Sequence, residues 1–181
     1  MKYALTFFSG LLFSTLAFAG QENIDRIEEA FMIGKNAQLN ELKEEYHGYE
    51  KAFAGYRLSV AYNVHGMRDK AEAEIKALIP LLKAEIERDQ SDVESWALLS
   101  SAYGMQIAFN PIMAIKYGPK AGKAMETALE LDETNPRVQL LAGIAKYNTP
   151  SMFGGSKKAA VESFQKAIAY YENDHNSGVH W

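Results

Sequence analysis

The chain has 181 residues, a formal net charge of −4 and no cysteine. The lack of cysteine excludes disulfides and a lipid-modified cysteine, so packing alone must stabilise the fold. Acidic and basic residues are interspersed along the sequence, so we expect no strongly basic face, and neither nucleic acid nor an anionic membrane surface as a partner.

Residues 1–19 have the features of a secretory signal peptide. Lys2 gives a positive start, an uncharged apolar run follows, and Ala17-Phe18-Ala19 places small residues where a signal peptidase reads them. We expect cleavage after Ala19 and a periplasmic mature chain without a membrane span. An uncleaved anchor is the alternative, although the apolar run is short for a span of about 20 residues.

The rest of the chain predicts helices separated by Gly and Pro, without strand signals. The predicted helices cover 24–34, 39–48, 49–64, 69–88, 92–109, 120–131, 135–148 and 156–171, and a polar tail covers 172–181. Pro80 predicts a kink in the fourth helix. Ser91-x-x-Glu94 has the spacing of a capping box, which predicts Ser91 as the N-cap of the fifth. A short turn that starts at Asn110-Pro111 is expected to end at Gly118-Pro119.

Three segments share one pattern of small and aromatic residues. The matching segments are Leu58-Ser59-x-x-Tyr62 with Ala71 and Ile75, Trp96-x-x-Leu99-Ser100-x-x-Tyr103 with Ala121-x-x-x-Met125-x-x-Ala128, and Gly143 with Ala160-x-x-x-Phe164-x-x-Ala167. This pattern resembles the tetratricopeptide repeat (TPR). Its units begin 41 and then 43 residues apart, whereas the family expects about 34. We assign the excess to 80–82, 109–119 and 149–155.

The resemblance implies an all-α fold in which antiparallel helix pairs stack as a short TPR-like superhelix. About three repeats would occupy residues 49–171, after N-terminal helices at 20–48 and before the tail at 172–181. Small residues would let the two helices of a pair approach closely, and large aromatic residues such as Trp96 would fill the space between units. An irregular helical bundle is the alternative that the same periodicity allows.

In this family one face of the first helix of each repeat lines the binding groove. The resemblance places here Phe53, Tyr56, Val60, Asn63, Glu94, Ala97, Ser101, Met105, Arg137, Leu140, Ile144, Tyr147 and Asn148. The residues expected to contact a partner are Tyr56, Asn63, Ser101, Arg137, Leu140, Tyr147 and Asn148. Aromatic, amide and guanidinium groups suit an extended peptide. Only Arg137 fits the Lys, Asn and Arg set with which some family members hold a terminal carboxylate, so that mode is not expected. The alternative is that the inserts or the N-terminal helices cover this face.

Two further segments carry apolar residues that need an explanation. In the loop 148–155 we expect Phe153 to pack into the core while the glycines let the chain turn, with an exposed binding loop as the alternative. The last helix carries an apolar stripe of Val161, Phe164, Ala167, Ile168 and Tyr171. We expect Trp181 to fold back over this stripe, with self-association through the last helix as the alternative.

The sequence has no cysteine nucleophile, no Gly-x-Ser-x-Gly and no His-Glu-x-x-His. We therefore expect no enzyme, no catalytic residue, no metal and no cofactor, and we interpret His175 and His180 as part of a solvated tail. Two functions remain. The first is a periplasmic adaptor that binds a peptide or protein in the groove. The second is an accessory subunit of an envelope assembly or substrate-binding-protein transporter, which holds a small ligand or docks a binding protein.

Overall fold

The computed structural model describes the backbone of residues 8–173 and the side chains of residues 20–173, and this part of the chain is helical without strands. The elements are α1 (Phe8–Met32), α2 (Asn36–Glu45), α3 (Gly48–Val64), α4 (Arg68–Arg88), α5 (Val93–Phe109), the 3-10 turn η1 (Pro111–Met113), α6 (Ala114–Leu131), α7 (Pro136–Asn148), the 3-10 turn η2 (Ser151–Phe153) and α8 (Lys157–Asn173). The expected all-α fold is thereby confirmed. No helix within residues 8–173 combines the length and the apolar composition that a membrane crossing requires.

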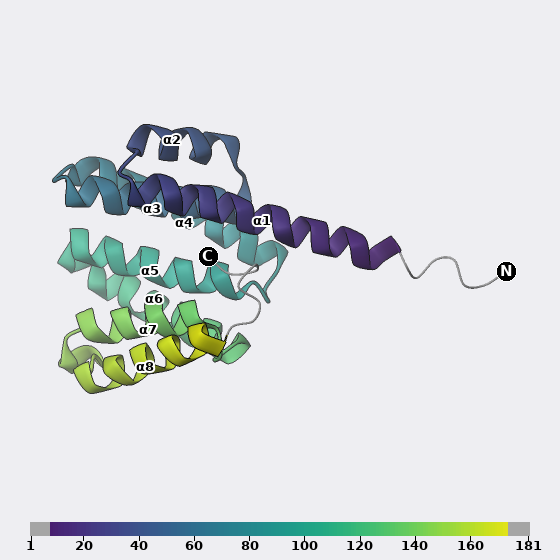
Figure 1. Cartoon of the computed structure of the whole chain (residues 1–181). Helices are drawn as coiled ribbons and strands as arrows, with labels where there is room; N and C mark the ends of the chain where they lie inside the picture. The colour runs from purple at the N-terminus through teal and green to yellow at the C-terminus, as the bar shows by residue number, and fades with distance from the viewer. Residues whose placement is uncertain (1–7, 174–181) are drawn as a thin grey trace.

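Three antiparallel pairs, α3 with α4, α5 with α6 and α7 with α8, stack one on the next, and α1 and α2 pack against α3 (Figure 1). The first two pairs repeat one contact. The Ser59 hydroxyl donates to the Ala71 carbonyl at 2.8 Å, and the Ser100 hydroxyl donates to the Ala121 carbonyl at 2.9 Å. Small residues therefore bring the two helices of a pair together, as predicted, and the architecture is that of a helical repeat.

The core consists of two clusters of buried apolar side chains. The larger one joins α1 to α5 and includes Ile27, Phe53 and Leu82. The smaller one joins α5, α6 and α7 and includes Val138. Trp96, on α5, is half-buried and packs against both clusters. Its predicted place between units is confirmed, and its contacts connect the two halves of the stack.

Gly143 takes the position of Ser59 and Ser100 in the third pair, where Phe164 of α8 lies directly against α7. A β-carbon added at Gly143 would lie 2.4 Å from Cε1 of Phe164. We expect Gly143→Ala to lower the free energy of unfolding by about 1–2 kcal/mol, because overpacking outweighs the better helix propensity of alanine. Urea melts measure this loss, and adding Phe164→Leu should recover most of it. A Gly143→Ala chain as stable as the original would contradict the close contact.

Two predicted helix boundaries are wrong. The N-cap of α5 is Asp92, whose carboxylate accepts from the Ser95 backbone at 3.0 Å. Ser91 instead donates its hydroxyl to the Asp89 carboxylate at 2.6 Å, so the turn holds Ser91 one residue before the N-cap. The predicted break at Gly118-Pro119 is also absent, because α6 begins at Ala114 and continues through Pro119. Pro119 is exposed, so the helix carbonyl that it leaves without a donor is open to water.

At the start of the chain, α1 begins at Phe8, inside the predicted signal peptide, and continues to Met32 as one helix. It ends two residues before Gly34, which has a positive φ of 72°. The predicted stop at this glycine is confirmed. α4 runs through Pro80 without ending.

Candidate partner-binding surface

We call the thirteen groove residues predicted above the first-helix face. At α3 part of this face is covered, because α1 packs against α3. Arg57 of α3 pairs with Glu28 of α1, and its guanidinium stacks 4.8 Å from the ring of Phe31 and 5.1 Å from the ring of Phe53. Phe53 is fully buried. In the first unit, therefore, α1 covers the part of the face beside Phe53, and Asn63 remains exposed.

Tyr56 and Ser101 meet where α3 packs beside α5. Tyr56 is half-buried. Burial raises the pKa of its phenol, and the positive charge of Arg57 and a hydrogen bond with the Ser101 side chain partly offset that rise. The structure thus brings these two predicted residues together, and it places them in a seam between units. Asn63 is exposed near the C-terminal end of α3.

Arg137 does not face a partner, which corrects its predicted role. Its side chain is fully buried, and it forms an ion pair with Glu94 of α5, with Nε donating to Oε2 at 3.1 Å. Asn135 donates to the same carboxylate at 2.8 Å and also caps α7 by accepting from the backbone of Arg137 and Val138. These contacts hold α7 against α5, so the guanidinium acts inside the fold.

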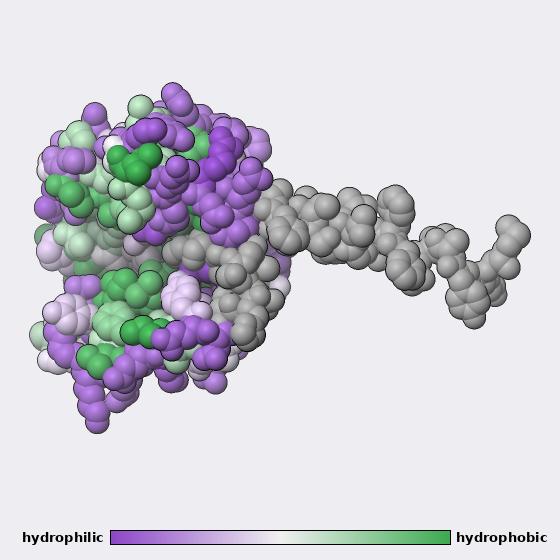
Figure 2. Space-filling model, viewed as in Figure 1, coloured by the Kyte–Doolittle hydropathy of each residue, from purple (hydrophilic) through white to green (hydrophobic). Residues whose placement is uncertain are grey.

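The open part of the first-helix face lies on α7. Leu140 is half-buried, whereas Ile144 is 43% exposed and Tyr147 is 50% exposed. We call these three residues the α7 patch. The ammonium of Lys157, at the start of α8, lies 3.2 Å from the centre of the Tyr147 ring. Asn148 is exposed and donates to the Ile144 carbonyl at 2.9 Å, so its amide completes the end of the helix. Hydrophobic surface over α5 and α7 is visible in Figure 2.

The loop between α7 and α8 presents its apolar tip to solvent, so the prediction that Phe153 packs into the core is wrong. Met152 and Phe153 are both exposed. The backbone explains why: Gly154 has a φ of 91°, and a β-carbon at Gly155 would lie 1.7 Å from the Thr149 carbonyl oxygen. Two glycines fold the loop tightly, as predicted, but they direct the tip away from the core.

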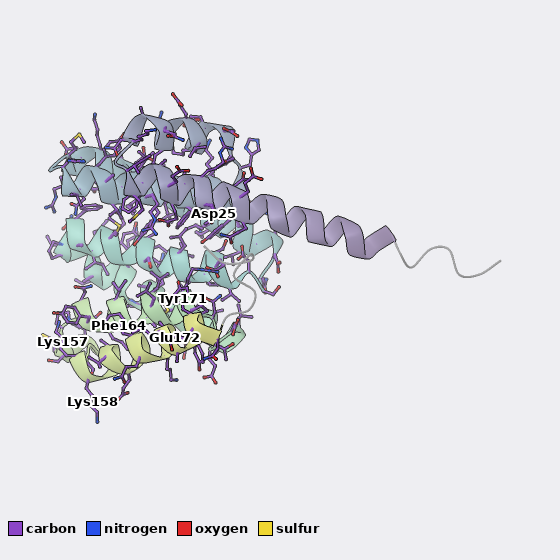
Figure 3. All side chains as sticks on the ribbon, in the orientation of Figure 1. Asp25, Lys157, Lys158, Phe164, Tyr171 and Glu172 are labelled. Carbon is purple, nitrogen blue, oxygen red and sulfur yellow. The ribbon has the colours of Figure 1, made fainter. Side chains whose placement is uncertain are left out.

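The apolar stripe of α8 is divided between two environments. Ala167 is buried and Phe164 is half-buried against α7. Val161, Ile168 and Tyr171 are exposed. Figure 3 labels Phe164 and Tyr171 along this helix. The predicted fold-back of Trp181 lies outside the described residues, as do His175 and His180.

A hollow of about 210 Å³ lies between the third pair and α6. Glutamate and lysine side chains both line it, together with Gln139 and Ser163. Gln139 and Lys146 of α7 occupy the positions that Trp96 and Tyr103 hold on α5, so polar groups stand where the preceding unit has aromatic rings. The hollow is smaller than the roughly 300–1,000 Å³ of sites for small molecules.

No family model matches the chain, and no curated protein is significantly similar to it. The structure by itself defines the class: an all-α protein of stacked helix pairs, with a repeat-like architecture.

Proposed function

We propose that this is an exported binding protein of the TPR kind, which holds a peptide or protein partner on the α7 patch and its surroundings. The observation that carries the proposal is the exposure of Ile144 and Tyr147 on a helix that buried contacts hold in place. An apolar and aromatic anchor on a rigid helix is typical of the centre of a protein interface. The matching serine contacts in the first two pairs support the TPR assignment.

The contrast between the two ends of the stack also supports this location. At α3 the part of the equivalent face beside Arg57 and Phe53 is already covered by α1, through Glu28 and Phe31. α1 therefore shows how an added helix can dock on this face, with an aromatic side chain and an ion pair. We infer that the partner makes comparable contacts at α7, with Tyr147 as the central anchor and Lys157 beside it.

The proposal is tested in the native envelope with a photo-crosslinking amino acid at position 144 or 147. We expect a defined protein adduct from both positions, identified by mass spectrometry. Position 83, which is exposed on α4, serves as the matched control and should give no such adduct. If position 83 gives the same adducts as 144 and 147, the α7 patch is not the binding surface.

A further inference from the structure

Alternate turns of the stack lie along one edge of the molecule, on the left in Figure 1. Successive helices run antiparallel, so the turns α1–α2, α3–α4, α5–α6 and α7–α8 meet at the same end. With the adjoining helix ends, these turns cover 32–36, 64–70, 110–120 and 149–158. We call these residues the odd-turn edge. The opposite end holds the turns at 44–50, 85–94 and 130–136, which we call the even-turn edge.

The two edges differ in charge. The odd-turn edge has seven Lys or Arg residues and one Asp, whereas the even-turn edge has eleven Asp or Glu residues and one Arg. Lys43, Lys51 and Arg137, directly beside the even-turn ranges, pair with Glu44 and Glu94 and so reduce the negative charge of that edge. The seven cations are Lys35, Arg68, Lys70, Lys116, Lys120, Lys157 and Lys158, and all are exposed. In the described part of the chain, none of them forms an ion pair with a carboxylate. These cations therefore gather at one edge, although the two signs are interspersed along the sequence.

The odd-turn edge also carries exposed apolar side chains between these cations. They are Met32, Ile33, Val64, Ile112, Ile115, Met152 and Phe153. Ile115 is 87% exposed and directly precedes Lys116, and Met152 is 81% exposed in the tight loop before Lys157. Hydrophobic and hydrophilic atoms alternate along this edge in Figure 2.

We propose that the odd-turn edge is a peripheral membrane-binding surface that docks on an anionic lipid bilayer. Lysines near an anionic surface are attracted to the headgroups, and apolar side chains at turn tips enter the boundary between headgroups and acyl chains. A nucleic acid would pair with the lysines and leave Met152 and Phe153 in water. The even-turn edge, being acidic, would point away from the bilayer. This surface adjoins the α7 patch, because Lys157 lies against the ring of Tyr147.

The test uses the processed chain, purified from the envelope fraction, and vesicles of phosphatidylcholine with or without phosphatidylglycerol. We expect sedimentation with the anionic vesicles, weakened by salt, and little with the neutral ones. Lys157→Gln with Lys158→Gln should lower the partition coefficient by roughly thirtyfold. Each lysine near an anionic surface contributes about 1 kcal/mol of attraction, and about 1.4 kcal/mol corresponds to a factor of ten. Met152→Ser with Phe153→Ser should lower it by about tenfold or more.

Lys83→Gln with Lys166→Gln is the matched control for charge, because both lysines are exposed and lie outside the odd-turn edge. It should bind as the original chain does. Equal binding to neutral and anionic vesicles, or equal losses in the control and the Lys157 and Lys158 variant, would overturn the proposal. The surface would instead belong to a polyanion if the chain bound duplex DNA and did not bind vesicles. In that case DNA binding would require the lysines and would not change on substitution of Met152 and Phe153. A variant with Ile144→Ser and Tyr147→Ala should still bind the anionic vesicles. This result would show that membrane binding does not depend on the proposed partner site.

Discussion

Replacing Arg137 with alanine should lower the free energy of unfolding by about 3–5 kcal/mol, because it leaves the Glu94 carboxylate partly buried without its cation. The Arg137 side chain is fully enclosed, and that of Glu94 is 20% exposed. The same change removes the partner that locks the start of α7 against α5. Urea or thermal melts followed by circular dichroism measure the loss.

Lys123→Ala is the matched control, since Lys123 pairs with Glu126 through side chains that are 66% and 60% exposed. An exposed pair contributes about 0–1 kcal/mol. Replacing both Glu94 and Arg137 by apolar residues of similar volume should cost less than Arg137→Ala alone. If Arg137→Ala costs no more than Lys123→Ala, the buried pair does not hold the second and third units together.

Replacing Trp96 with alanine should cost about 3 kcal/mol, since it removes a large side chain that packs against both core clusters. The indole Nε1 also donates to the Gln90 carbonyl at 3.0 Å, which ties the α4–α5 turn to α5. Trp96→Phe keeps most of the packing and should cost clearly less. A Trp96→Ala chain whose stability changes by less than about half a kcal/mol would rule out this role.

Most of the helical fold is predictable from the sequence because its signals are local. Apolar residues at helical spacing, as in Ile24, Ile27 and Phe31, establish the helices, and Gly34 and Gly66 end two of them at positive φ. One of the two failed boundaries involves competition within one turn. At α5 the Asp89 carboxylate binds the Ser91 hydroxyl, so Asp92 caps the helix in place of the predicted Ser91.

The site was harder to predict because exposure depends on contacts between units. Arg137 and Glu94 occupy equivalent positions in successive units, 43 residues apart. The opposite charges at these equivalent positions indicated an ion pair between the second and third units. This ion pair was not predicted. Phe53 is buried on α3, against which α1 packs. The residues around Phe53 in the sequence do not indicate that α1 packs there.

The separation of the basic turns from the acidic turns was not predicted, for a similar reason. Along the sequence, basic turns such as 64–70 and acidic turns such as 85–94 follow each other, so the charges look mixed. The hairpins place alternate turns at opposite ends and thereby separate them (Figure 1). This separation can be read from the sequence only once the helix boundaries are known.

The central claim, that the α7 patch binds the partner, is tested most directly by titrating the crosslinked partner against a variant with Ile144→Ser and Tyr147→Ala. Both side chains are exposed, so the variant should fold and melt as the original does. The account predicts a loss of affinity of about thirtyfold or more, as for the removal of a central anchor. The control, Ile33→Ser with Val64→Ser, should bind normally, since these exposed side chains lie at other turns. Unchanged affinity in a fully folded Ile144 and Tyr147 variant would contradict the claim.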